Sequence, residues 1–268
     1  MDMLKTVEIL TSVLVVGWTT HVRGQVSEKV VEIPTRPRVT QRMLVLSPEN
    51  PKAAAILLAG GHGGLQISAD RSFKWGKGNF LVRSRQLFVD AGLMVVVVDA
   101  PSDRQKPPYL SGFRGTREHI TDLKAVIAWL RKKADVPVWL VGTSRGTESA
   151  AFAATSLTGH DGPNGLVLTS TILTDSKEFS VPALQLDRLR IPVLVVHHVR
   201  DGCSHCPFGG ISKLMDQLGN SPKKELFPVK GGVSQGDPCE ARSYHGFNGV
   251  EAEVVKKIGE WMLETGAR

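Results

Sequence analysis

The sequence is short of several features, and each shortage excludes a class of protein. Only 3 of its 268 residues are cysteine, which is too few for a scaffold held by disulfides but enough for one bridge. It has no internal repeat and no low-complexity segment. Aromatic residues make up 6%, without the dense basic stripe and interleaved aromatics of nucleic-acid binders. We therefore expect no nucleic-acid partner.

Long hydrophobic runs are also missing. The segment 9–20 is free of charge, but a membrane-spanning helix needs about 20 apolar residues, so no stable span is expected. This segment instead suits a signal-peptide core, with small residues at 22 and 24 before a cleavage at Gln25. The sequence predicts a signal peptide over 1–24, one domain over 25–268, and a periplasmic or secreted protein. The alternative is a cytoplasmic protein in which this segment forms an amphipathic helix or a strand added to the body. Lys5 is the only basic side chain of the leader, and Asp2 and Glu8 accompany it.

What is present is an ordinary globular composition with a basic excess. Hydrophobic residues make up 41% and charged residues 22%, which excludes a disordered or fibrous chain. The 33 Lys and Arg exceed the 26 Asp and Glu by 7. Between residues 70 and 135 there are 13 basic and 7 acidic side chains. We interpret most of this excess as surface bias.

Short apolar runs separated by amphipathic segments predict a parallel sheet buried on both faces. The expected strands are 53–59, 93–98, 136–141, 166–172, 191–196 and 224–229, preceded by an antiparallel strand at 43–46. The expected helices are 80–91, 117–133, 145–156, 211–218 and 250–263. The fold class is therefore α/β, with helices on both faces of a mostly parallel sheet.

The strongest local motif is Gly142-Thr143-Ser144-Arg145-Gly146, between an expected strand and a helix of small residues. This context is typical of a nucleophile elbow, a tight turn that exposes a serine. A serine becomes a good nucleophile when a histidine removes its proton and a carboxylate orients that histidine. Asp201 follows the strand 191–196, and His245 precedes the last helix. All three fall at the carboxyl edge of the sheet, where ligand sites lie.

Other residues compete for two of these roles. Asp175 follows the expected strand 166–172 and is the rival acid. His197 and His198 end a strand, so we expect them to be structural, and we expect His119 and His160 to be solvated. Asp201 is favoured because it follows a strong strand at a short offset.

From Gln41 to the C-terminus the chain resembles the α/β-hydrolase superfamily. The matching segments are ILLAGGHGG, VVVVDAPSD, VWLVGTSRGTESAA, IPVLVVHHVRD and YHGFNG. The resemblance implies Ser144 as nucleophile, His245 as base and then acid, and Asp201 as orienting carboxylate, with no cofactor. It also implies an oxyanion hole from the backbone N–H of Arg145 and of either Gly61 or His62.

The three cysteines lie in the two loops that carry the expected acid and base. Cys203 and Cys206 follow the acid and Cys239 precedes the base, so a bridge from Cys239, with Cys206 as the favoured partner, would join these loops. Such a bridge needs an oxidising compartment. A zinc site would need further ligands at tight spacing, so no metal is expected.

These residues predict a serine hydrolase that cleaves small carboxylic esters through an acyl-enzyme. Thioester or amide hydrolysis by the same residues, and a non-catalytic ligand-binding protein on this scaffold, are the alternatives. We expect no large lid domain and a pocket walled by Trp75 and Tyr109. A rim of Arg71, Arg104 and Arg114 would favour an anionic substrate. The sequence indicates no oligomeric state.

Overall fold

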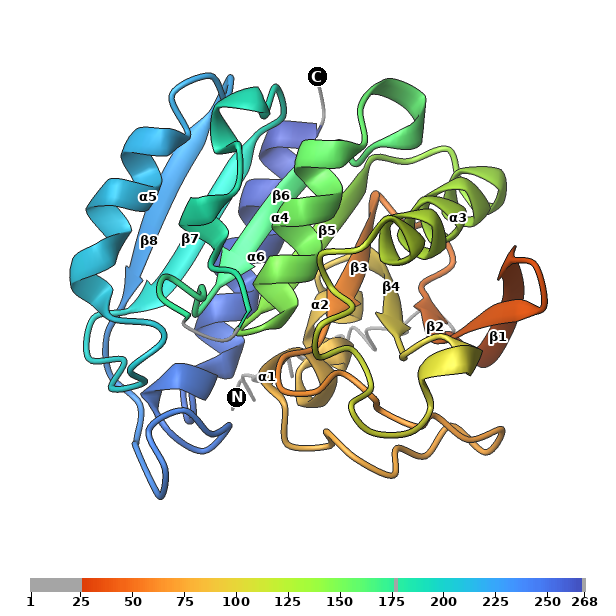
Figure 1. Cartoon of the computed structure of the whole chain (residues 1–268), viewed down its shortest axis with the longest axis horizontal. Coiled ribbons are helices and arrows are strands. Elements are labelled where there is room, and N and C mark those ends of the chain that lie inside the picture. The colour runs from red at the N-terminus through yellow and green to blue at the C-terminus, as the bar shows by residue number, and fades with distance from the viewer. Residues whose placement is uncertain (1–25, 176–177, 267–268) are drawn as a thin grey trace, which may run out of the picture.

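The structure is a computed structural model, and it describes residues 26–175 and 178–266. Eight strands form one sheet with helices on both faces (Figure 1). The strands are β1 Ser27–Arg36, β2 Val39–Ser47, β3 Ala53–Leu58, β4 Leu93–Val98, β5 Val138–Thr143, β6 Gly165–Thr169, β7 Val193–His198 and β8 Lys224–Val229. The helices are α1 Phe80–Arg83, α2 Arg85–Asp90, α3 Arg117–Lys133, α4 Gly146–Ser156, α5 Ile211–Gln217 and α6 Glu251–Gly266.

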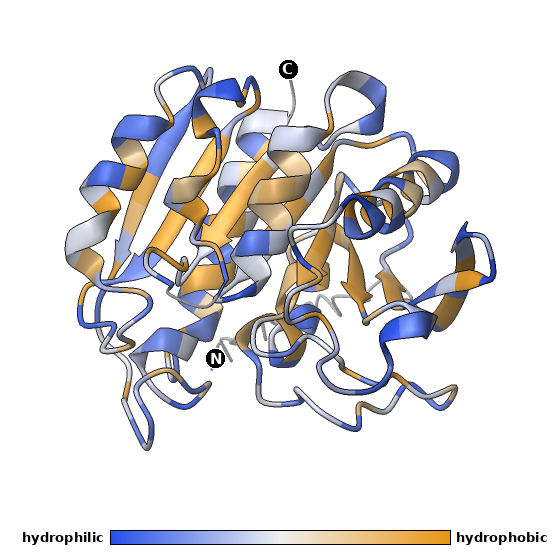
Figure 2. Cartoon of the chain, viewed as in Figure 1, coloured by the Kyte–Doolittle hydropathy of each residue, from blue (hydrophilic) through white to orange (hydrophobic). Residues whose placement is uncertain are grey.

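Strand β3 shows why the apolar runs are continuous. Ala54, Ile56 and Leu58 point into a core shared with α3, α4 and α5. The alternate residues of β3 point into a second core, shared with α1, α2 and α6. Since successive side chains of a strand face opposite sides, both sets must be apolar. Figure 2 shows the result, with hydrophobic strands between helices whose outer faces are hydrophilic.

The strand order β1-β2-β4-β3-β5-β6-β7-β8 determines where the site lies. β1 and β2 pair antiparallel, as do β2 and β4, whereas every pair from β4 to β8 is parallel. The carboxyl ends of these six parallel strands therefore meet at one edge. The loops after β3, β5, β7 and β8 all leave the sheet there, which confirms the predicted fold class.

Two elements differ from the sequence expectation. The sequence does not predict β1, because only Ile33 of this edge strand is buried and its polar side chains give no apolar run. The expected helix 80–91 is divided at Ser84 into α1 and α2. There the Leu87 N–H bonds to the Ser84 carbonyl at 2.9 Å, a tighter i to i+3 turn.

The segment between β6 and β7 is short. It contains two single-turn 3₁₀ helices, η3 Val181–Ala183 and η4 Leu186–Arg188. Apart from residues 176–177, which the structure does not describe, it leaves no room for a large lid domain. The predicted signal peptide, 1–24, also lies outside the described residues. Within the described part, no helix combines the length and apolarity needed to cross a membrane.

Candidate active site

Ser144 stands on a strained turn between β5 and α4. Its φ is 51°, a left-handed value that a non-glycine residue rarely adopts and that recurs at functional sites. The flanking glycines make this turn feasible. A Cβ on Gly146 would lie 1.9 Å from the Leu58 carbonyl oxygen, and one on Gly142 would lie 2.5 Å from the Gly146 oxygen. The G-x-S-x-G motif is therefore a requirement of close backbone packing.

His245 and Asp201 form a buried pair. His245 lies on the 3₁₀ turn η6 Tyr244–Gly246, and its Nδ1 is 2.9 Å from Oδ2 of Asp201, three residues beyond β7. Because a carboxylate accepts, Nδ1 carries the proton and Nε2 presents a lone pair. Nε2 is buried and has no hydrogen-bond partner among the described residues. This pair can thus accept a proton from a group placed before Nε2.

Ser144 and His245 both line one pocket of about 470 Å³. Arg145, Gly60 and Gly61 line it too. A Cβ on Gly60 would lie 2.8 Å from Cβ and 3.4 Å from Oγ of Ser144. The loop after β3 therefore runs directly against the serine, as a backbone oxyanion hole requires.

Arg114 holds the glycine loop, the segment after β3 that contains Gly60 and Gly61, through hydrogen bonds. Its side chain is buried; one terminal nitrogen donates to Oγ of Ser149 at 2.8 Å, and the other donates to the carbonyls of Ala59 at 3.2 Å and Gly61 at 3.1 Å. Burial lowers its pKa to about 10, so it remains charged at neutral pH. The expectation that Arg114 belongs to a surface rim is therefore wrong.

The other expected rim residues do not gather at this pocket. Arg71 lies in a different surface hollow, with its guanidinium 3.7 Å from the Glu28 carboxylate. Arg104 stacks over the Phe113 ring at 4.6 Å. The pocket wall instead includes Asp237 and Glu240, both exposed. The charge of the pocket wall therefore does not favour an anionic substrate.

Asp175, the rival acid, belongs to a different cluster. Its carboxylate is 2.6 Å from the Arg145 guanidinium, which also lies 3.4 Å from Glu148 and 3.9 Å from Glu178. The Glu148 side chain is fully buried, and this burial raises its pKa to about 7. Sequence reasoning missed the cluster, since Glu148 reads as an ordinary polar residue of a helix.

Three further histidines are buried, and His160 is exposed, as expected. His197 Nε2 is 2.9 Å from the Cys206 carbonyl and 3.5 Å from Oδ2 of Asp201. His198 stacks on Tyr244 with 4.4 Å between ring centroids. His119 is not solvated as expected: it bonds to Oγ of Ser149 at 2.9 Å, and burial lowers its pKa to about 3.

Three aromatic rings form a stack beside the glycine loop. The His62 ring lies 3.8 Å from that of Trp75 and 4.3 Å from that of Tyr109. Nδ1 of His62 accepts the Gly64 N–H at 3.1 Å. Trp75 lines the pocket and is 37% exposed. Tyr109 is the third ring of this stack and contacts His62.

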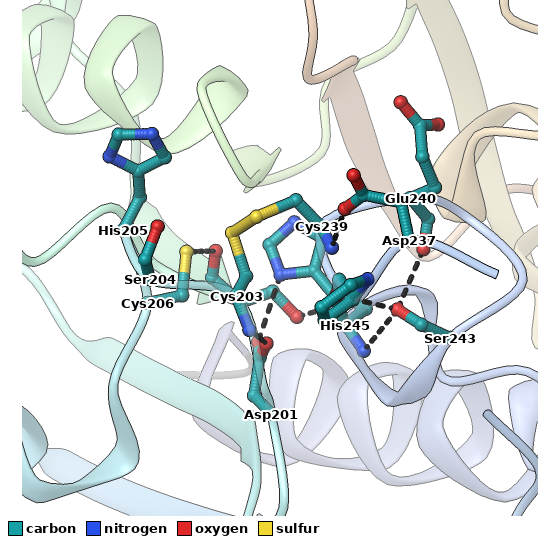
Figure 3. Close-up of a disulfide and its surroundings, with 12 residues drawn as sticks. Asp201, Cys203, Ser204, His205, Cys206, Asp237, Cys239, Glu240, Ser243 and His245 are labelled. Carbon is teal, nitrogen blue, oxygen red and sulfur yellow. Dashed lines mark hydrogen bonds and ion pairs between the residues drawn. A yellow bond between two sulfur atoms is a disulfide. The ribbon is translucent and has the colours of Figure 1, made fainter. Parts of the chain in front are cut away.

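The disulfide joins the two loops that carry Asp201 and His245, as expected, but with a different pairing. Cys203 is bonded to Cys239, and Cys206 is a buried free thiol (Figure 3). The predicted Cys206–Cys239 pairing is therefore wrong. Cys203 is also tied to the acid, since its N–H donates to Oδ1 of Asp201 at 2.9 Å. The Cys206 thiol instead donates to the Ser170 carbonyl at 3.4 Å.

No protein-family model and no curated protein sequence matches the chain. Among solved structures it is similar to a dienelactone hydrolase from Anabaena variabilis, with 15% identity, 90% of this chain and 99% of that one covered, and a TM-score of 0.61. A Pyrococcus furiosus esterase gives 15% identity, 90% and 93% coverage, and a TM-score of 0.65. Est1E from Butyrivibrio proteoclasticus, with ferulic acid bound, gives 15% identity, 89% and 100% coverage, and a TM-score of 0.61. These likenesses show that the chain has the α/β-hydrolase fold.

Proposed function

We propose that this protein is a serine hydrolase that cleaves carboxylic esters through an acyl-enzyme. One observation carries the proposal. The Asp201–His245 pair leaves Nε2 open, and His245 lines the same pocket as Ser144. A fold alone would not carry it, because α/β scaffolds host many activities.

In the proposed mechanism Nε2 of His245 takes the hydroxyl proton of Ser144 as Oγ attacks the ester carbonyl carbon. Asp201 accepts the Nδ1 hydrogen bond and stabilises the imidazolium that forms. The imidazolium then protonates the departing alkoxide, leaving Ser144 acylated. Water, activated by the same nitrogen, releases the acid and restores the serine.

The oxyanion would be stabilised by two backbone N–H groups. Arg145 supplies one, because it directly follows the nucleophile at the start of α4. Gly61 is favoured over His62 for the other. Gly61 lines the pocket, whereas the His62 ring is held in the stack between Trp75 and Tyr109.

The pocket favours small uncharged esters. A volume of about 470 Å³ lies within the usual range for small-molecule sites. Asp237 and Glu240 are on its wall, and Arg145, which also lines it, already pairs with Asp175. An anionic ester would therefore meet mainly like charge. Thioesters and small amides remain chemically compatible with the same residues, as runners-up.

A fluorophosphonate probe and a series of nitrophenyl esters test this function together. We expect the wild type to be labelled and to hydrolyse short acyl chains fastest. The Ser144→Ala variant should lose both labelling and turnover while keeping its melting temperature. Unlabelled wild type, or labelling that survives in Ser144→Ala, would favour a ligand-binding protein without turnover.

A further inference from the structure

Three side chains of the types that bind metals lie close together, and two of them, Cys203 and His245, line the pocket. Cys203, Cys206 and His245 are all buried, and one ligand atom from each lies within 4.8 Å of the other two. Figure 3 shows the cysteines beside the Asp201–His245 pair. In a tetrahedral zinc site the corresponding atoms lie about 3.6–3.8 Å apart. Shifts of about 1 Å or less therefore separate this cluster from that geometry.

The donor types also match zinc. Two cysteines with C-x-x-C spacing and one histidine form a ligand set used by zinc sites that keep a fourth position for water. Nδ1 of His245 donates to Asp201 at 2.9 Å, so Nε2 is the nitrogen whose lone pair a metal ion would take. A histidine whose other nitrogen bonds to a carboxylate is the usual orientation of a metal ligand. Nε2 is buried and unpartnered among the described side chains.

In the structure the cluster lacks one of the ligands that a metal ion would need. The Cys203 sulfur is bonded to Cys239, so it is not available as a thiolate. Cys206 is the remaining thiol. A single thiol beside His245 does not make a metal site. The oxidation state of the disulfide therefore decides whether the cluster has its ligands.

We infer that reduction of the Cys203–Cys239 disulfide creates a binding site for Zn²⁺ formed by Cys203, Cys206 and His245. A dithiol reductant transfers two electrons and two protons to the bridge and becomes a disulfide itself. The thiolate of the reductant attacks the sulfur of Cys239, because Cys239 is the more exposed of the two bridged cysteines. Zn²⁺ then displaces the protons of the two ligand thiols to solvent and takes the Nε2 lone pair.

Metal binding at this site would stop ester hydrolysis, and this consequence rests on the proposed function. The lone pair that binds Zn²⁺ is the one that would accept the Ser144 proton. The protein would thus be active when oxidised, and inhibited by zinc when reduced. Binding of the metal itself requires no turnover and is measured separately.

Cobalt absorbance tests binding without any ester. The wild type is reduced with a dithiol, freed of it by gel filtration without oxygen, and titrated with Co²⁺. We expect a thiolate-to-cobalt absorption band that saturates at about one equivalent. Zn²⁺ should abolish the band. The oxidised wild type should give none, and the reduced Ser144→Ala variant should match the reduced wild type.

Two cysteine variants identify the ligands. Cys239→Ser leaves Cys203 free without removing a ligand, so this variant should bind Co²⁺ with no reductant. Cys206→Ser removes one ligand and should weaken binding by about tenfold or more after reduction. The inference is overturned if reduced wild type gives no thiolate band, or if Cys206→Ser binds as tightly.

Zinc inhibition is then measured on a short nitrophenyl ester. Micromolar Zn²⁺ should inhibit the reduced wild type and Cys239→Ser, and a chelator should restore their activity. The oxidised wild type should be unaffected. Binding without inhibition would contradict the role of His245 as catalytic base rather than the metal site.

Discussion

Arg114 holds Gly61, 53 residues earlier in the chain, through a hydrogen bond of 3.1 Å from its guanidinium to the glycine carbonyl. The same side chain reaches Ala59 and Ser149, so one buried cation connects the glycine loop to α4. The two backbone segments proposed to form the oxyanion hole are thereby held at a fixed separation. Fixed donors are what make such a hole effective.

Replacing this cation should affect both catalysis and stability. Arg114→Met leaves the buried Ala59 carbonyl and the Gly61 carbonyl without this donor and removes the bond to Ser149. We therefore expect a loss of about 2–4 kcal/mol in the free energy of unfolding. Displacement of the glycine loop should lower kcat by about 10- to 100-fold, with a smaller effect on KM. Arg104→Met, which removes a cation over the Phe113 ring, is the matched control. Equal kinetics for the two variants would contradict the role given to Arg114.

The choice between the two acids leads to a direct comparison. Asp201→Asn should lower kcat/KM by about 10³- to 10⁴-fold, because the amide no longer selects the Nδ1–H form of His245. Asp175→Asn should cost less than about tenfold in kcat/KM, since Asp175 pairs with the Arg145 guanidinium. Kinetics on one short ester, with melting temperatures as a check on folding, measures both. A larger loss for Asp175→Asn would reverse the assignment.

Glu148 should make stability depend on pH. Burial raises its pKa to about 7 from its ordinary value of 4.5, so between these values the folded protein retains a proton that the unfolded chain has released. Its contribution is therefore fully present below pH 4.5 and is lost as pH rises through 7, by about 3 kcal/mol. Urea unfolding at pH 5 and pH 8 should show a steeper decline for the wild type than for Glu148→Gln. Parallel declines would contradict a raised pKa.

The disulfide gives a prediction about pairing and stability. Alkylation of denatured, unreduced protein should modify Cys206 alone, and modification of Cys203 would contradict the pairing. The bridge closes a loop with a sequence separation of 36, which is worth about 4 kcal/mol by chain entropy. Urea unfolding with and without a dithiol measures that difference.

Export is a separate proposal, supported by the disulfide, because such bridges persist in oxidising compartments. We expect the mature chain to begin at Gln25, after removal of residues 1–24. The mass of the intact protein from the periplasmic fraction measures the cleavage. A mature protein that still contains the initial Met1 segment would contradict it.

The sheet, and the positions of Ser144, Asp201 and His245 at its carboxyl edge, could be predicted because local patterns indicate them. Apolar runs predict buried strands, and the glycines around Ser144 follow from a backbone approach that admits no side chain. The positions of Asp201 and His245 could be predicted from topology, because the carboxyl ends of parallel strands meet at one edge of the sheet. These inferences need only the order of residues along the chain.

Other parts of the site depend on contacts between distant segments. Arg114 sits in a polar, glycine-containing stretch that reads as surface, and its burial arises only when that stretch packs over the glycine loop. Cys203 and Cys206 are three residues apart, so sequence alone does not decide which one reaches Cys239. His119 occupies a position in α3 whose partner, Ser149, comes from α4.

Trp75 gives the protein a built-in optical probe. Its ring forms part of the pocket wall and is partly open to water, so a molecule entering the pocket would replace that water and alter the emission of this indole. Trp139 and Trp261 are buried in the core and pack edge to face, with 5.4 Å between their ring centroids, so they should report unfolding instead. Occupation of the site and melting of the fold should therefore give separable fluorescence signals in a single unlabelled sample.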